Sequence, residues 1–215
     1  MPKSLVSSQV IKRLPRYYRF LGELERNGTI RISSRELSQR MGFTASQIRQ
    51  DLNCFGGFGQ QGYGYNVPEL RKAIGRILGI DAANPTVLIG AGNLGKALTV
   101  HIDFNTRGFK LVGIFDNDPK ICTTQISGLP VMNIDTIESF CESNKPVCAI
   151  LCIPKTAAEK LVPRLIKCGI TAFWNFSHYD LTTTENIIVE NVHLSDSLMT
   201  LAYGLNNADD KKEKL

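Results

Sequence analysis

One stretch, residues 85–116, constrains the fold of this chain most, because it reads as a strand, a glycine-rich turn, a helix, a second strand and an acidic residue in that order. Its turn, Gly90-Ala91-Gly92-Asn93-Leu94-Gly95, fits the pattern G-x-G-x-x-G. In that pattern the first glycine permits the tight turn, the second lets the backbone approach a pyrophosphate, and the third lets helix and strand pack closely. The stretch therefore predicts a dinucleotide-binding βαβ unit, although a glycine turn that merely joins a strand to a helix would also fit.

The acidic residue at the end of this stretch is Asp116, 26 positions after Gly90. A carboxylate there accepts hydrogen bonds from an adenosine ribose, and its charge repels a 2′-phosphate, so we expect NADH and NAD as cofactors rather than their phosphorylated forms. The helix that follows the glycine turn points its unpaired N–H groups at the phosphates of the dinucleotide. The pattern predicts as cofactor-binding residues Gly90, Ala91, Gly92, Asn93, Leu94, Gly95, Lys96 and Asp116.

The positive charge of the chain is concentrated near its N-terminus. The formal net charge is +5, yet residues 1–66 hold 10 Lys and Arg against 4 Asp and Glu, whereas residues 67–215 hold 15 against 16. A localised basic excess is typical of a domain that binds a polyanion, although a solvated basic surface gives the same count.

Capping residues define short helices in this basic part. A first helix is expected with Pro15 in its first turn. Ser33 or Ser34 then fits the cap of a second helix that Gly42 ends, and Thr44 fits the cap of a third, so the pair predicts a helix-turn-helix unit. Residues 55–65 hold five glycines and four aromatic residues. This composition favours a β-hairpin wing over a flexible loop.

The third helix is expected to read DNA bases. Its Gln47, Arg49 and Gln50 should be exposed while Ile48 and Leu52 face the core, and Arg pairs with guanine as Gln does with adenine. Phosphate contacts are expected from Arg13, Arg16, Arg31 and Arg40. With double-stranded DNA as the partner, the predicted DNA-binding residues are Arg13, Arg16, Ser33, Thr44, Gln47, Arg49, Gln50, Gln61 and Tyr63.

The remaining chain alternates strand and helix signals, which is typical of a parallel sheet with helices on both faces. We therefore predict an α/β chain with an N-terminal winged-helix DNA-binding domain over residues 1–80. A Rossmann domain, that is a doubly wound parallel sheet, is expected over residues 81–193. A C-terminal helix is expected over residues 194–206, with an apolar stripe, and a charged, disordered tail over residues 207–215.

Several features argue against other classes of protein. No segment resembles a signal peptide or a membrane span, so a soluble cytoplasmic protein without a membrane partner is expected. The six cysteines form no C-x-x-C pair and no metal-finger spacing, which favours reduced thiols and no metal site. The histidines, His101, His178 and His193, lie in no recognisable catalytic motif, and little chain is left for a substrate domain. The sequence therefore favours sensing a dinucleotide over an enzyme that turns it over.

Three other functions fit parts of the sequence. An NAD-dependent oxidoreductase with a DNA-binding appendage would share the glycine pattern. A CoA-binding regulator would share it too, because related folds accept CoA at similar turns, although Asp116 argues against it. A thiol-based regulator would use the six cysteines.

Taken together, these residues resemble the Rex family, bacterial transcriptional repressors that respond to the NADH/NAD ratio. The resemblance runs from about residue 10 to residue 205. It rests on RLPRYYRFL at 13–21, SSRELSQRMG and QIRQDLNCFGGFGQQGYGY within 33–65, GAGNLGKAL at 90–98, FDNDP at 115–119, WNF at 174–176 and VENV at 189–192.

The resemblance implies a redox-sensing repressor that binds a palindromic operator as a homodimer and is released when NADH binds. It also implies that the C-terminal helix is domain-swapped, which would give the apolar stripe of Leu198, Leu201 and Leu205 a partner. By the same resemblance, the residues near the cofactor include Pro154, Asn175, Phe176 and His101, and those that couple it to the DNA-binding domain are Arg19 and His193. Histidine stands at positions 101 and 193, where tyrosine and aspartate are common in the family.

Overall fold

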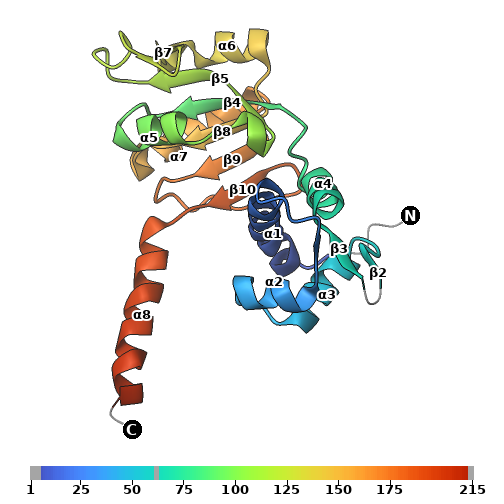
Figure 1. Ribbon diagram of the computed structural model, residues 1–215. Coiled ribbons are helices and arrows are strands. Elements are labelled where there is room, and N and C mark those ends of the chain that lie inside the picture. The colour runs from blue at the N-terminus through green and yellow to red at the C-terminus, as the bar shows by residue number, and fades with distance from the viewer. Residues whose placement is uncertain (1–5, 61–62, 213–215) are drawn as a thin grey trace. The chain divides into compact units, whose positions relative to one another are not determined.

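The computed structural model describes residues 6–60 and 63–212. The chain divides into two compact units, Met1–Asp81 and Ala82–Leu215 (Figure 1). The boundary lies one residue beyond the predicted one.

The N-terminal unit has the element order of a winged-helix domain. A three-stranded antiparallel sheet places β3 between β1 and β2, so β2 and β3 form the expected wing. The predicted contact residue Gln61 lies between these strands, outside the described residues. The elements are α1 (Ser8–Arg26), β1 (Arg31–Ile32), α2 (Ser34–Met41), α3 (Ala45–Asn53), β2 (Gly59–Gln60), β3 (Gly64–Asn66) and α4 (Val67–Leu78).

The capping residues place α2 and α3 as the sequence predicted. Ser33 and Glu36 form a reciprocal capping box at the start of α2, and Gly42 ends that helix with a φ of 70°. Thr44 accepts a hydrogen bond from the backbone N–H of Gln47, at 3.1 Å, and so caps α3. These caps fix where each helix begins. The apolar faces of α2 and α3 then pack into one core.

The start of α1 differs from the prediction. Ser7 caps the helix by accepting a hydrogen bond from Val10, so Pro15 lies inside the helix rather than in its first turn. A proline there removes one backbone hydrogen bond. The buried face of α1, which includes Val10, Leu14 and Leu21, extends on both sides of the proline and holds the helix together by packing.

The C-terminal unit is a seven-stranded sheet in the order β10-β9-β8-β4-β5-β7-β6. Every neighbouring pair is parallel except β6 with β7. The strands are β4 (Asn84–Ile89), β5 (Phe109–Asp116), β6 (Gln125–Ile126), β7 (Leu129–Asn133), β8 (Cys148–Leu151), β9 (Ala172–Asn175) and β10 (Ile188–Asn191).

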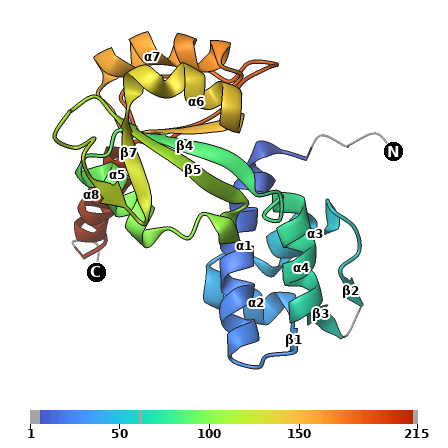
Figure 2. The same cartoon turned by 90° about the horizontal axis from the view of Figure 1, so that it is seen from above.

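Helices cover both faces of this sheet, as expected for a doubly wound fold. Figure 2 shows α6 (Ile137–Asn144) and α7 (Lys155–Lys167) on one face and α5 (Asn93–His101) on the other. Each face has its own apolar cluster, with Leu161 and Leu165 of α7 in one and Leu98 of α5 packed against the other.

The last helix, α8 (Leu194–Lys212), is longer than predicted. The structure continues it through Lys212, into the segment expected to be a disordered tail. Between Leu205 and Lys212 the sequence holds neither glycine nor proline to stop a helix.

Candidate functional site

The glycine turn lies at the carboxyl edge of the sheet, where β4 passes into α5. Strand β4 is flanked by β5 on one side and β8 on the other, so the chain winds outward in both directions from this point. In open α/β sheets, ligands bind at such a topological switch point. The fold therefore places the predicted nucleotide-binding turn where a nucleotide crevice is expected.

The glycines of the turn meet the steric demands predicted for them. Gly90 has a φ of 96°, and a Cβ built there would lie 2.5 Å from the carbonyl oxygen of Cys152. A Cβ at Gly95 would overlap the carbonyl oxygen of Gly90. A Cβ at Gly92, in contrast, meets nothing within 4 Å in the described part of the chain. Gly90 and Gly95 are thus required by the fold, whereas Gly92 borders open space that a pyrophosphate can use.

The start of α5 supplies hydrogen-bond donors to that space. Gly92 is its N-cap residue, and no side chain among the described residues caps it. Pro154 occupies the same position at the start of α7, directly after β8, again without a side-chain cap from the described residues. Exposed Lys96 lies in the first turns of α5. Uncapped helix N-termini attract anions through their free N–H groups.

Asp116 is held against the glycine turn rather than left in solvent. Its Oδ2 accepts a hydrogen bond from the backbone N–H of Ala91 at 2.7 Å, and its Oδ1 accepts one from Asp118 at 2.9 Å. The residue is 8% exposed. An ionised carboxylate has about four acceptor positions, so capacity remains for ribose hydroxyls. The turn and the predicted ribose ligand are therefore joined by a hydrogen bond and lie side by side.

The structure changes the interpretation of Asn175, which was predicted to lie near the cofactor. Its side chain is fully buried, its Nδ2 donates to Tyr179 O and Asn191 Oδ1, and its Oδ1 accepts from the backbone and hydroxyl of Ser177. These bonds use every hydrogen-bonding position of the amide. Asn175 therefore shapes the loop after β9, whereas Phe176 is half-buried and keeps part of its side chain accessible.

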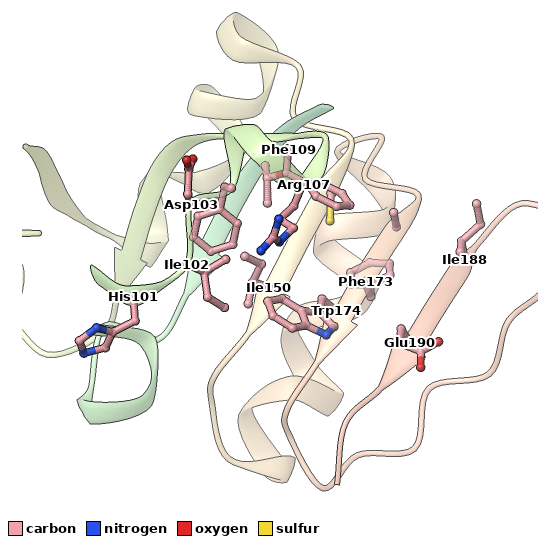
Figure 3. A pocket seen from close by; sticks show the side chains of 14 residues that line it. His101, Ile102, Asp103, Arg107, Phe109, Ile150, Phe173, Trp174, Ile188 and Glu190 are labelled. Carbon is pink, nitrogen blue, oxygen red and sulfur yellow. The ribbon is translucent and has the colours of Figure 1, made fainter. Parts of the chain in front are cut away.

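His101 does not lie at the glycine turn. It ends α5, at the opposite end of that helix from Gly92, and it lines a cavity of about 490 Å³ over the sheet (Figure 3). The strand register places Ile150, Trp174 and Glu190 side by side on the floor of this cavity. Contact between His101 and the cofactor stays a prediction.

The residues predicted to read bases lie on α3. Arg49 and Gln50 are exposed, while Gln47 is half-buried. The Arg49 guanidinium donates a hydrogen bond to Ser34 Oγ at 3.1 Å, which links α3 to the start of α2. These three side chains therefore share one helix with a buried opposite face, the arrangement that base readout requires.

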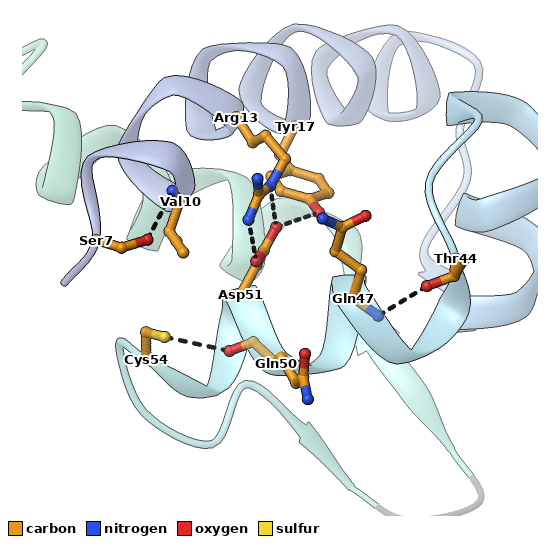
Figure 4. Close-up of polar contacts among 9 residues, drawn as sticks. All are labelled: Ser7, Val10, Arg13, Tyr17, Thr44, Gln47, Gln50, Asp51 and Cys54. Carbon is orange, nitrogen blue, oxygen red and sulfur yellow. Dashed lines mark hydrogen bonds and ion pairs between the residues drawn. The ribbon is translucent and has the colours of Figure 1, made fainter.

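Arg13, in contrast, was predicted to bind phosphate, and the structure pairs it with a carboxylate inside the domain. Its Nε and Nη2 donate to the two carboxylate oxygens of Asp51, each at 2.7 Å, and the Tyr17 hydroxyl donates to Asp51 Oδ2 at 2.9 Å (Figure 4). The hydrogen bond to Asp51 raises the pKa of Arg13. Burial, followed by the same carboxylate, raises the pKa of Tyr17. One signal in the sequence points to this pairing, an acidic residue, Asp51, between the inward-facing Ile48 and Leu52.

Other arginines of this unit remain on the surface. The Arg16 guanidinium lies 4.7 Å from the ring centre of Phe43, and that of Arg31 lies 5.8 Å from the ring centre of Tyr63 in the wing. Arg40 is exposed in the last turn of α2. Stacking on an aromatic face orders a guanidinium and leaves donors free, although Arg31 also donates from Nη1 to the Tyr63 carbonyl oxygen at 3.3 Å. These side chains therefore keep the phosphate-binding capacity predicted for them.

The two predicted coupling residues belong to different units. Arg19 is exposed on α1. His193 precedes α8, its Nε2 lies 3.3 Å from Asp180 Oδ1, and its ring stacks on His178 with centres 6.1 Å apart. A pairing of Arg19 with His193 stays a prediction.

Across residues 6–60 and 63–212, no helix has the length and apolar character of a membrane span. The fold and the site define a class of protein, a winged-helix domain joined to a Rossmann-type nucleotide-binding domain. Comparison with known protein families supports both domains of this class. Residues 5–53 match the family model described as putative DNA-binding protein N-terminus, and residues 81–179 match the one described as CoA binding domain.

Similarity over nearly the whole chain identifies the family. The chain is 55% identical over 207 residues to the redox-sensing transcriptional repressor Rex of Thermoanaerobacter sp. (strain X514), covering 96% of this chain and 92% of that protein. It is 51% identical to the protein of the same name from Clostridium perfringens (strain SM101 / Type A), covering 97% and 99%. The chain therefore belongs to the Rex family of redox-sensing transcriptional repressors.

Solved structures of a Rex-family repressor called RSP match the fold. RSP in complex with beta-NAD+ and operator DNA has a TM-score of 0.88 and 53% identity, covering 98% of this chain and 97% of that chain. RSP in complex with beta-NADH has a TM-score of 0.89 and 50% identity, covering 99% and 100%. The prediction of a regulator rather than an enzyme is confirmed by relatives named as transcriptional repressors.

Proposed function

We propose that this protein represses transcription by binding operator DNA through α3 and its wing, and that NADH bound at the glycine turn releases it. The observation that carries the proposal is the full-length similarity to RSP, whose structures include one complex with NAD+ and operator DNA and another with NADH. The cradle of Gly90, Gly92 and Asp116 supplies the nucleotide site in this chain.

Release requires unequal binding of NADH by two states of the protein, because a ligand with equal affinity for both states shifts nothing. The reduced nicotinamide ring is neutral and the oxidised ring is cationic. Burial of an uncompensated cation is costly, so an apolar pocket favours NADH. NADH and NAD differ in the charge of this ring, while the cradle residues hold the phosphates and ribose that both share.

The same proposal includes a homodimer on a palindromic site. Each chain offers one recognition helix, so a two-fold symmetric operator would engage two chains. Helix α8 exposes Leu198, Leu201 and Leu205 at 66%, 58% and 62%. An exposed apolar stripe of this kind marks an interaction surface, and a domain-swapped helix in a dimer would cover it. A repressor of this kind works beside the chromosome, which in a bacterium means the cytoplasm.

Binding of CoA is the second candidate, because residues 81–179 match the CoA binding domain model. Asp116 argues against it, since CoA carries a ribose phosphate that a carboxylate at the turn would repel. A competition titration decides between them. Labelled NADH is bound first. Unlabelled NADH should displace it fully, whereas CoA at the same concentrations should not.

A thiol-based response is disfavoured at three of the six cysteines, whereas Cys54 is exposed. Burial raises the pKa of Cys148 to about 11 and that of Cys152 to about 12. Burial, together with nearby Cys168, raises the pKa of Cys141 to about 12. These groups are thiols rather than reactive thiolates near neutral pH.

An electrophoretic shift assay tests the proposed function. The protein should bind a palindromic DNA selected from a random pool, and NADH should release it at concentrations at which NAD does not. Selection of no common sequence, or equal release by the two nucleotides, would contradict the proposal.

A further inference from the structure

We infer that Arg13 and Asp51 are positioning residues for sequence readout: their fork-shaped ion pair sets how the recognition helix α3 is presented to DNA. This inference rests on the proposed function, because it needs α3 to be the helix that reads bases. It assigns a role to a buried carboxylate that base or phosphate contacts do not explain.

Burial of Asp51 shows that it is not a DNA contact. Its side chain is 3% exposed, and it lies on the inner side of α3, between Ile48 and Leu52, which are both buried. A carboxylate in such a place is costly unless it is paired and hydrogen-bonded. Arg13 and Tyr17 supply three hydrogen bonds to its two oxygens.

The geometry of these bonds makes the contact directional. Arg13 approaches with two donors, Nε and Nη2, each 2.7 Å from a different oxygen of Asp51. Two parallel bonds fix the plane of the carboxylate as well as its distance. Because Arg13 and Tyr17 both belong to α1, the three bonds fix the rotation of α3 about its own axis relative to α1 (Figure 4).

Rotation of α3 matters because Arg49 and Gln50 are exposed on this helix, so a turn of the helix about its axis moves both side chains. Bidentate pairing with a base edge needs donors and acceptors in register. Phosphate contacts tolerate more displacement, because a charge attracts along any direction. Loosening the Arg13–Asp51 fork should therefore reduce discrimination between sequences more than it reduces attraction to DNA in general.

The decisive variant is Arg13→Lys, which keeps the positive charge and loses the fork. The full-length protein is titrated with a palindromic DNA that the unmodified protein selects from a random pool, and with a scrambled DNA of the same length, over a range of salt concentrations. A positioning role predicts about tenfold weaker binding to the selected DNA, the effect of one misplaced base contact, with unchanged binding to the scrambled DNA and an unchanged salt slope.

Two further variants keep the inference testable if Arg13→Lys fails to fold, which a thermal melt will show. The pair Arg13→Met with Asp51→Leu removes both charges and refills the space, so the net charge and the salt slope should stay constant while selectivity falls. Tyr17→Phe removes one hydroxyl and should lower selectivity by a smaller factor.

Arg16→Ala is the matched control, because exposed Arg16 stands one turn along the same helix. It should weaken binding to both DNAs equally and lower the salt slope by about one. Arg13 variants that behave like Arg16→Ala, or an Arg13→Lys protein with full selectivity, would overturn the inference alone. An unmodified protein that selects no sequence would overturn the proposed function and the inference with it.

Discussion

Single residues in the nucleotide cradle have separable roles, and Gly90 and Gly92 form a matched pair. Gly90→Ala places a methyl group 2.5 Å from the Cys152 carbonyl oxygen at a φ of 96°. We expect it to lower the free energy of unfolding by more than about 1–2 kcal/mol, the strain of a left-handed residue by itself. Gly92→Ala has space in the chain, so it should lower the free energy of unfolding much less than Gly90→Ala, by no more than the cost of an alanine N-cap, while weakening NADH binding. A Gly92→Ala protein with full NADH affinity would remove Gly92 from the phosphate site.

Asp116 gives a second prediction at this scale, about which nucleotide binds. Asp116→Asn keeps the size of the side chain and removes its charge, so repulsion of a 2′-phosphate should decrease. We expect the preference for NADH over NADPH to fall by roughly 1–3 kcal/mol, the scale of one partly screened charge interaction. Calorimetry with both nucleotides measures it. Equal affinity of the unmodified protein for NADH and NADPH would show that the charge has no such role.

The spacing of residues along the sequence predicted the cradle, because its residues lie in one turn, one helix and one strand that follow each other in the chain. Arg13 was not predictable in this way. Whether its side chain faces a phosphate or the protein depends on Asp51, which lies 38 residues away in sequence, so its direction is a property of the packed domain. The same holds for Asn175, whose amide is used by Ser177, Tyr179 and Asn191 once the loop after β9 closes.

Helices and strands were predictable where a cap or a period marked them. Ser33, Gly42 and Thr44 marked α2 and α3, and alternation marked the larger sheet. The errors fall where such signals are weak. Helix α1 begins before Pro15 because its apolar face extends on both sides of the proline, and α8 continues beyond its predicted end.

Helix α8 carries the prediction at the scale of elements. Removing residues 194–215 should give a monomer with poor DNA binding, because the burial of Leu198, Leu201 and Leu205 is worth roughly 1.5–3 kcal/mol for each side chain. Removing only residues 206–215 is the control and should leave the dimer intact. Analytical ultracentrifugation separates the two results. A dimer that survives the longer deletion would refute the exchanged helix.

For the whole molecule, two compact units have to act as one switch. The N-terminal unit holds the basic excess and the base-reading helix, and the C-terminal unit holds the nucleotide cradle. The order of units followed from the sequence, since each carries its own motifs. How one unit biases the other depends on the dimer, which no local pattern encodes. Thermodynamics nevertheless constrains it, because coupling between two binding sites is reciprocal.

Reciprocity gives the most direct measurement of the central claim, that NADH and operator DNA compete for states of one protein. NADH is titrated into the full-length protein by calorimetry, with and without saturating palindromic DNA selected by the protein itself. The account predicts that DNA weakens NADH binding by the same factor by which NADH weakens DNA binding, about 5- to 150-fold for typical couplings. An NADH affinity that is the same with and without bound DNA would contradict the account.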